Sequence, residues 1–142
     1  MGVITALISG ALMSIQGVWN TQLTKETSQW VTNSYVQATA LVVSLVAWFF
    51  TGKESFAKLF SINNKLLLFA GVLGAFITRT VIKSTATLGP ARAALLIVVS
   101  QIAVSYLIEL FGLWGMEKQP FEWRKLIGVI ISAVGIIIFK WK

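Results

Sequence analysis

The chain has 142 residues, of which 56% are hydrophobic and only 12% are charged, and its formal net charge is +7. Soluble domains carry about 25% charged residues, so this composition argues against a soluble globular domain. The sequence has no Cys and no His, which excludes disulfides, thiolate catalysis and metal ligation by these residues. We therefore expect no metal, no cofactor and no enzymatic activity.

Five apolar runs follow one another along the chain. Each is close to the length of about 20 residues that a helix needs to cross a hydrocarbon core of about 30 Å. Lipid leaves backbone groups without water, which favours helices, and the runs are too long for barrel strands of about 10 residues. The pattern predicts an all-α polytopic membrane protein in which residues 1–142 form a single domain. The five transmembrane helices are expected at about residues 2–20, 30–50, 65–84, 90–113 and 123–140.

The segments at the ends of these runs carry further signals. The first run lacks a basic leader and a cleavage site, so we expect a retained helix and not a signal peptide. The loop Thr51–Lys65 holds Phe56 and Phe60 among lysines, which predicts an interfacial amphipathic turn. Gly89 and Pro90 predict a break before the fourth helix, with the proline in its first turn.

Small residues recur at helical spacing in the first, third and fifth runs. In lipid, close approach of backbones replaces the hydrophobic effect as a driving force for helix association, although Gly and Ala are common in membrane helices anyway. The residues that we predict to serve helix packing are Gly10, Ser14, Gly71, Gly74, Gly128, Ser132 and Gly135.

Polar side chains inside a membrane are costly and usually face a cavity or a partner helix. Gln16 and Asn20 share one face of the first helix, and Gln101 and Ser105 share one face of the fourth. We predict that these four residues line a substrate cavity. The alternative for Gln16, Gln101 and also Gln37 is an interhelical hydrogen bond, worth about 0.6–2 kcal/mol.

Two charged residues within the runs are candidates for ion coupling. Glu109 is the one acidic residue there. It either reaches the membrane surface toward Lys118 or Arg124, or exchanges a proton or holds a cation. In an antiparallel pair of chains, Arg79 of one copy and Glu109 of the other would lie at comparable depth, which suggests an ion pair between them.

Five crossings divide the twelve basic residues equally between the two sides of the membrane. Basic residues normally concentrate on the cytoplasmic side, so a tie predicts that the chain inserts in both orientations. The alternative is a weak bias, because Arg79 or Arg92 lies too deep to count. The amino-terminal side receives Lys53, Lys58, Lys65, Lys118, Arg124 and Lys125. The opposite side receives Lys25, Arg79, Lys83, Arg92, Lys140 and Lys142.

Several motifs together resemble the YdcZ-type family, a family of unknown function in the drug/metabolite transporter (DMT) superfamily. The most specific part is the stretch from Leu88-Gly89-Pro90-Ala91-Arg92 through Ser100-Gln101 to Ile108-Glu109-Leu110-Phe111-Gly112. The last helix adds Arg124-Lys125-Leu126-Ile127-Gly128 and Ala133-Val134-Gly135, and the first helix adds Gln16 and Asn20. The resemblance covers nearly the whole chain. In the family pattern an Asp commonly stands in place of Glu109, and Arg79 is not part of the pattern.

The resemblance implies a multi-pass protein of the bacterial inner membrane that is half of a ten-helix transporter and pairs with a second, inverted copy. The expected function is small-molecule transport, as an exporter working by alternating access within an antiparallel dual-topology homodimer. The expected partners are that second copy, the lipid bilayer and an unidentified small-molecule substrate, with proton coupling through Glu109 left open. No nucleic acid is expected. The alternatives are a dual-topology ion channel and a non-transporting membrane partner subunit.

Overall fold

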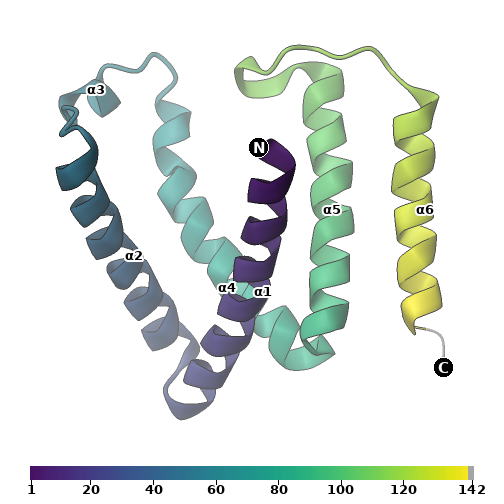
Figure 1. Cartoon of the computed structure of the whole chain (residues 1–142), viewed down its shortest axis with the longest axis horizontal. Helices are drawn as coiled ribbons and strands as arrows, with labels where there is room; N and C mark the ends of the chain where they lie inside the picture. The colour runs from purple at the N-terminus through teal and green to yellow at the C-terminus, as the bar shows by residue number, and fades with distance from the viewer. Residues whose placement is uncertain (141–142) are drawn as a thin grey trace. The chain divides into compact units, whose positions relative to one another are not determined.

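The computed structural model of the chain describes residues 1–140, without the side chain of Lys140. Lys142 and the Lys140 side chain, which entered the charge count, therefore lie outside the described residues. Every regular element in the described part is a helix, as predicted (Figure 1). In chain order the elements are α1 (Gly2–Glu26), α2 (Gln29–Thr51), α3 (Ala57–Phe60), the 3-10 helix η1 (Lys65–Phe69), α4 (Ala70–Leu88), α5 (Pro90–Phe111), the 3-10 helix η2 (Leu113–Gly115) and α6 (Trp123–Lys140).

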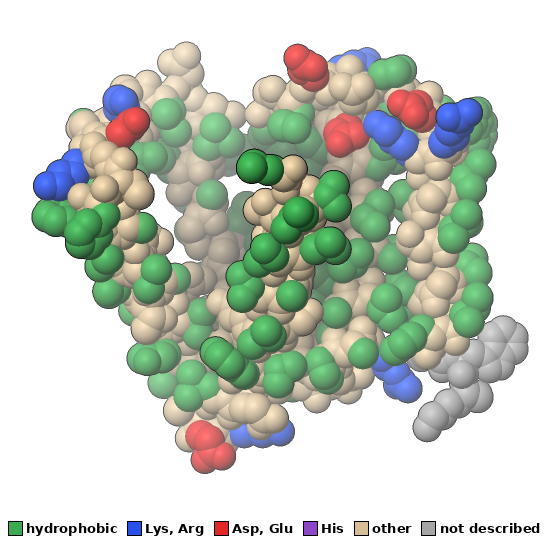
Figure 2. Space-filling view, viewed as in Figure 1, with side chains coloured by type: hydrophobic (Ala, Val, Ile, Leu, Met, Phe, Trp, Pro, Cys, Tyr) green, Lys and Arg blue, Asp and Glu red, His purple; other side chains and the backbone are tan. Residues whose placement is uncertain are grey.

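Four of these segments are long and apolar enough to cross a membrane: Gly2–Glu26, Gln29–Thr51, Lys65–Leu88 and Pro90–Phe111. Their mean hydropathy runs from 1.5 to 2.1. Helix α6 has 18 residues, about 27 Å at 1.5 Å per residue, and a fifth crossing by α6 stays a prediction. Figure 2 shows apolar side chains along the lengths of the helices and charged side chains at their ends. This distribution is that of a multi-pass membrane protein.

Two helix ends lie beyond their predicted positions. Helix α1 continues to Glu26 instead of residue 20, and α4 continues to Leu88 instead of residue 84. In α1, the hydroxyls of Thr21 and Thr24 donate to the carbonyls of Gly17 and Asn20 at 2.8 Å, so these polar side chains find acceptors within their own helix. Hydropathy marks where the membrane ends, and a helix with its own hydrogen bonds can extend past it, so the predicted membrane-spanning ranges stay predictions.

The chain forms two compact units, Met1–Thr87 and a second that begins at Leu88. The prediction of one five-helix domain over residues 1–142 remains a prediction. Pro90 opens α5, as expected, after Gly89 with φ +81.

In the first unit, three amide side chains of α2 fasten that helix to α4. Gln29, Asn33 and Gln37 are spaced four residues apart, and therefore share one helix face. Gln29 Nε2 donates to the Arg79 carbonyl at 3.1 Å, and Asn33 Nδ2 donates to the Ala75 carbonyl at 3.0 Å. One helix turn further on, Gln37 Nε2 donates to Thr78 Oγ1 at 3.4 Å. For Gln37 the interhelical alternative therefore holds.

The predicted packing glycines differ in their surroundings. A Cβ at Gly74 would lie 3.8 Å from Gln37 Nε2, so this glycine faces α2. Within the described residues, a Cβ at Gly10, Gly71, Gly128 or Gly135 would meet no atom within 4 Å. Gly10, Gly71 and Gly135 are therefore open to lipid or to another chain, and Gly128 borders a groove between α5 and α6.

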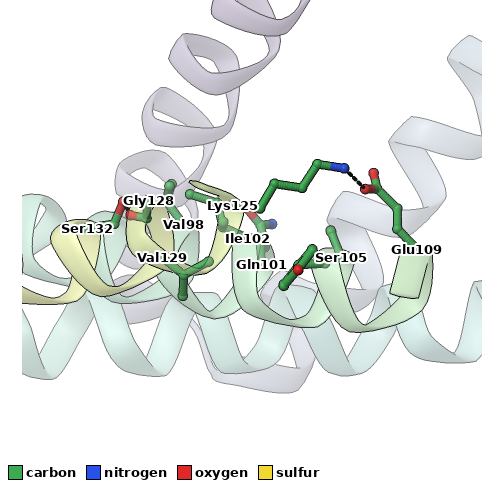
Figure 3. Close-up of a pocket in the computed structure, with 10 residues that line it drawn as sticks. Val98, Gln101, Ile102, Ser105, Glu109, Lys125, Gly128, Val129 and Ser132 are labelled. Carbon is green, nitrogen blue, oxygen red and sulfur yellow. Dashed lines mark hydrogen bonds and ion pairs between the residues drawn. The ribbon is translucent and has the colours of Figure 1, made fainter. Parts of the chain in front are cut away.

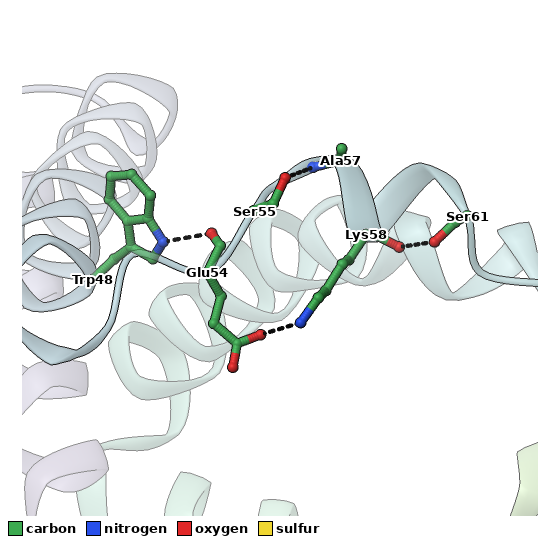
Figure 4. A network of polar contacts seen from close by, with 6 residues as sticks. All are labelled: Trp48, Glu54, Ser55, Ala57, Lys58 and Ser61. Atoms are coloured by element: carbon green, nitrogen blue, oxygen red, sulfur yellow. Dashed lines mark hydrogen bonds and ion pairs between the residues drawn. The ribbon is translucent and has the colours of Figure 1, made fainter.

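The loop after α2 folds into a compact structure around Trp48, shown in Figure 4. Trp48 Nε1 donates to the Glu54 carbonyl at 2.9 Å, and its ring lies 4.9 Å from that of Phe56. Lys58 Nζ pairs with Glu54 Oε2 at 2.8 Å. The expected turn is thus present as α3, and its position at the membrane interface remains a prediction.

In the second unit, α5 and α6 are neighbouring antiparallel helices joined by a loop that folds back onto the end of α5 (Figure 1). Gly112 ends α5 in the left-handed conformation, with φ 64°, and a Cβ there would lie 3.1 Å from Lys118 Cβ. Gln119 N–H donates to the Glu109 carbonyl at 2.9 Å. The buried Tyr106 hydroxyl donates to the Glu122 carbonyl at 3.3 Å and accepts from the Glu122 N–H at 3.2 Å. These bonds set where α6 begins.

Replacing Asn33 by Ala is expected to lower the free energy of unfolding by about 1 kcal/mol, because one hydrogen bond between α2 and α4 is lost. The measurement is unfolding of the purified protein in mixed micelles by SDS titration, followed by circular dichroism. Ser44→Ala is the matched control, because the Ser44 hydroxyl bonds only within α2, to the Ala40 carbonyl. Equal stability of the two variants would contradict the fastening role of Asn33.

Replacing Tyr106 by Phe is expected to loosen the start of α6, because both bonds to the Glu122 backbone disappear while the ring remains. Amide hydrogen exchange of residues 119–126 in nanodiscs should accelerate about tenfold, as expected for roughly 1.4 kcal/mol. Tyr35→Phe, which changes an exposed tyrosine of α2, is the control. Unchanged exchange in Tyr106→Phe would show that the hydroxyl does not position α6.

Candidate functional site

An open groove of about 520 Å³ lies between α5 and α6 in the second unit (Figure 3). Its volume falls within the range of about 300–1,000 Å³ that is usual for small-molecule sites. The residues that line it are Val98, Gln101, Ile102, Ser105, Tyr106, Glu109, Lys125, Gly128, Val129 and Ser132. A mostly apolar wall with a few polar groups is the usual make-up of a site for a small organic molecule.

The polar side of this groove comes from one face of α5. Gln101, Ser105 and Glu109 follow one another at steps of four residues, so all three point the same way, as predicted. Among the described residues, the side-chain amide of Gln101 makes no hydrogen bond to the protein. Unlike Gln37, Gln101 thus keeps its donors and acceptor available in the groove.

Glu109 forms an ion pair at the end of this groove, with Lys125 of α6. Figure 3 shows the Lys125 side chain reaching across to Glu109, and Nζ lies 3.3 Å from Glu109 Oε2. Glu122 Oε1 lies 3.9 Å from the same Nζ. In the single chain the Lys125 and Glu109 side chains are 37% and 42% exposed, and an ion pair exposed to water is worth at most about 1 kcal/mol. It can therefore open at low cost.

From the sequence, Glu109 was expected to reach toward Lys118 or Arg124, and Lys125 was not predicted as a site residue. The sequence feature that could have indicated Lys125 is its helical spacing with Gly128 and Ser132, which lie on the same face of α6. Gly128 and Ser132, predicted as packing residues, line the groove. The Glu109–Lys125 pair also borders a second hollow of about 500 Å³, lined in addition by Gly115, Met116, Glu117 and Gln119.

A larger groove of about 830 Å³ lies between α1 and α2 in the first unit. It contains Gln16 and the buried Asn20, together with the ring of Tyr35. The Gln16 amide makes no hydrogen bond to another part of residues 1–140. The structure therefore brings Gln16 to Asn20 and Gln101 to Ser105, each pair within its own unit, and a cavity shared by all four remains a prediction.

Arg79 has partners within its own unit. Its Nε donates to Gln29 Oε1 at 3.4 Å, and its guanidinium lies 4.5 Å above the Trp30 ring. The pairing of Arg79 with Glu109 of a second copy remains a prediction. Residues 1–140 contain no group of three or more acidic, Cys or His side chains that could hold a metal ion.

Long apolar helices with charged side chains at their ends define a multi-pass membrane protein (Figure 2). A family model described as "DMT_YdcZ: Putative inner membrane exporter, YdcZ" matches residues 1–138. The chain belongs to this family, which confirms the resemblance and places the protein in the inner membrane. No curated protein matches the chain. No solved structure matches it either.

Proposed function

We propose that the protein exports a small organic molecule by alternating access, as an antiparallel homodimer in which each chain crosses the membrane five times. The observation that carries this proposal is the α5–α6 groove, where unbonded polar side chains stand in an apolar wall. Polar side chains inside a membrane usually face a partner helix or a cavity, so the exposed Gln101 amide, which bonds to no other described residue, is suited to a ligand. The family description as an exporter agrees with this function.

An inverted second copy would complete the transporter. Helices α1, α2, α4 and α5 have at most 6% of their most apolar windows buried within one chain, which leaves wide faces for another chain. The equal division of basic residues fits insertion in both orientations. In an antiparallel pair the twofold axis lies in the membrane plane, so the inward-open and outward-open states are equivalent by symmetry.

The direct test is flux of a panel of labelled small organic molecules into proteoliposomes, with and without a pH gradient. We expect saturable flux for at least one compound. Gln101→Leu should lower that flux at least about fivefold, because one hydrogen bond to the substrate is lost. Thr80→Ala, which lines none of these grooves and whose hydroxyl bonds within α4, is expected to transport normally. A linear conductive current would indicate a channel. No flux of any compound in the panel would indicate a non-transporting subunit. Either result would overturn the proposal.

The orientation can be read with single cysteines, since the chain has none. Asn63→Cys lies in the loop before η1, and Glu26→Cys lies at the end of α1, which is on the opposite side in the five-crossing topology. Neither change alters a Lys or Arg. A membrane-impermeant maleimide added to intact cells should label about half of each variant. Full labelling of one and none of the other would show a single orientation.

A further inference from the structure

We propose that the polar end of the α5–α6 groove binds an organic monocation, and that the Lys125 ammonium occupies the place of the ligand's charged group. This inference rests on the proposed function, because it assigns a substrate class to the same groove. It follows from what surrounds Lys125 Nζ, from the shape of the adjoining wall and from the weakness of the ion pair.

The surroundings of Lys125 Nζ are those of a cation site. Glu109 Oε2 lies 3.3 Å away, Glu122 Oε1 lies 3.9 Å away, and the centroid of the Tyr106 ring lies 6.0 Å away. A carboxylate combined with an aromatic face is a combination that recognises ammonium groups. Two carboxylates face this one ammonium, so its departure leaves both of them without their shared partner. Glu117 borders the adjoining hollow.

The wall next to this site suits the hydrocarbon part of such a ligand. Val98, Ile102 and Val129 line the groove beside the ion pair. The groove volume of about 520 Å³ is large enough for a cation that carries several apolar substituents. Gln101 and Ser105 are the polar groups along the way to Glu109, and neither brings a charge that would repel a cation.

Lys125 can leave the site without disturbing the fold. Its backbone is held in the first turn of α6, where Lys125 N–H donates to the Glu122 carbonyl at 3.1 Å. The position of α6 is set by Tyr106 and Glu122 through bonds that do not involve the ammonium. The flexible lysine stem lets Nζ swing away while the helix stays in place. The lysine then acts as a tethered competitor of the ligand.

The test is equilibrium binding to the full-length protein in detergent micelles, with tetraphenylphosphonium as cation probe and tetraphenylborate as an anion of nearly the same shape. Lys125→Ala should bind the cation about fivefold more tightly than the wild type, because the competing ammonium is gone. Glu109→Gln should bind it at least about fivefold more weakly. Lys125→Arg keeps a charge at the site and should resemble the wild type. The borate anion should show none of these changes.

Arg124→Ala is the matched control, because it removes a positive charge from the neighbouring position and leaves the Glu109–Lys125 pair intact. It should change the affinity for the cation less than twofold. Equal or weaker cation binding by Lys125→Ala, while Lys125→Arg binds as the wild type does, would overturn the inference.

The binding assay does not depend on transport, which separates the two proposals. If the protein transports other molecules but its affinity for the cation probe does not change with these substitutions, the cation site alone is refuted. A protein that binds the cation in the expected pattern and shows no flux of any compound would refute the transport function alone.

Discussion

The absence of water in the hydrocarbon core is the constraint on which the rest of this structure depends. A polar side chain there needs a hydrogen-bond partner in the protein or a cavity that holds water or a polar ligand. The amide nitrogens of Gln29, Asn33 and Gln37 donate to acceptors on α4, whereas the buried Asn33 Oδ1 has no partner among the described residues. The amides of Gln16 and Gln101 border grooves and have no bond to residues 1–140. Polar side chains of the same chemical kind thus divide into those that fasten helices and those that line grooves.

In the second unit, the contacts that join α5 to α6 also position the residues that line the groove between these helices. The bonds between Tyr106 and Glu122, and the left-handed turn at Gly112, bring the start of α6 back beside the end of α5. The folded-back loop places Lys125 opposite Glu109. The position of this ion pair therefore depends on hydrogen bonds between uncharged groups of the loop and α5.

Much of the fold follows from the sequence, because membrane thickness sets the length of an apolar run. The helix ends at Glu26 and Leu88 were not predicted, because hydropathy follows the membrane and not the backbone hydrogen bonds that continue a helix past it. The shared face of Gln101, Ser105 and Glu109 is a local property of helix spacing and was predictable. Lys125 was not found, because its place opposite Glu109 depends on the returning loop, a contact across 16 residues. The role of Gln37 was likewise undecided. Whether an amide bonds to another helix or lines a groove depends on whether the neighbouring helix places an acceptor near it, as Thr78 does here.

The most direct test of the division between fastening and lining residues is the free energy of unfolding of Gln101→Leu, measured by SDS titration beside the wild type. A groove-lining amide contributes nothing to the folded chain, so the account predicts a stability within about 0.5 kcal/mol of the wild type, or higher, because an unbonded polar group has been replaced by an apolar one. A loss of about 1–2 kcal/mol, the value of an interhelical hydrogen bond, would show that Gln101 fastens helices and would contradict the central claim.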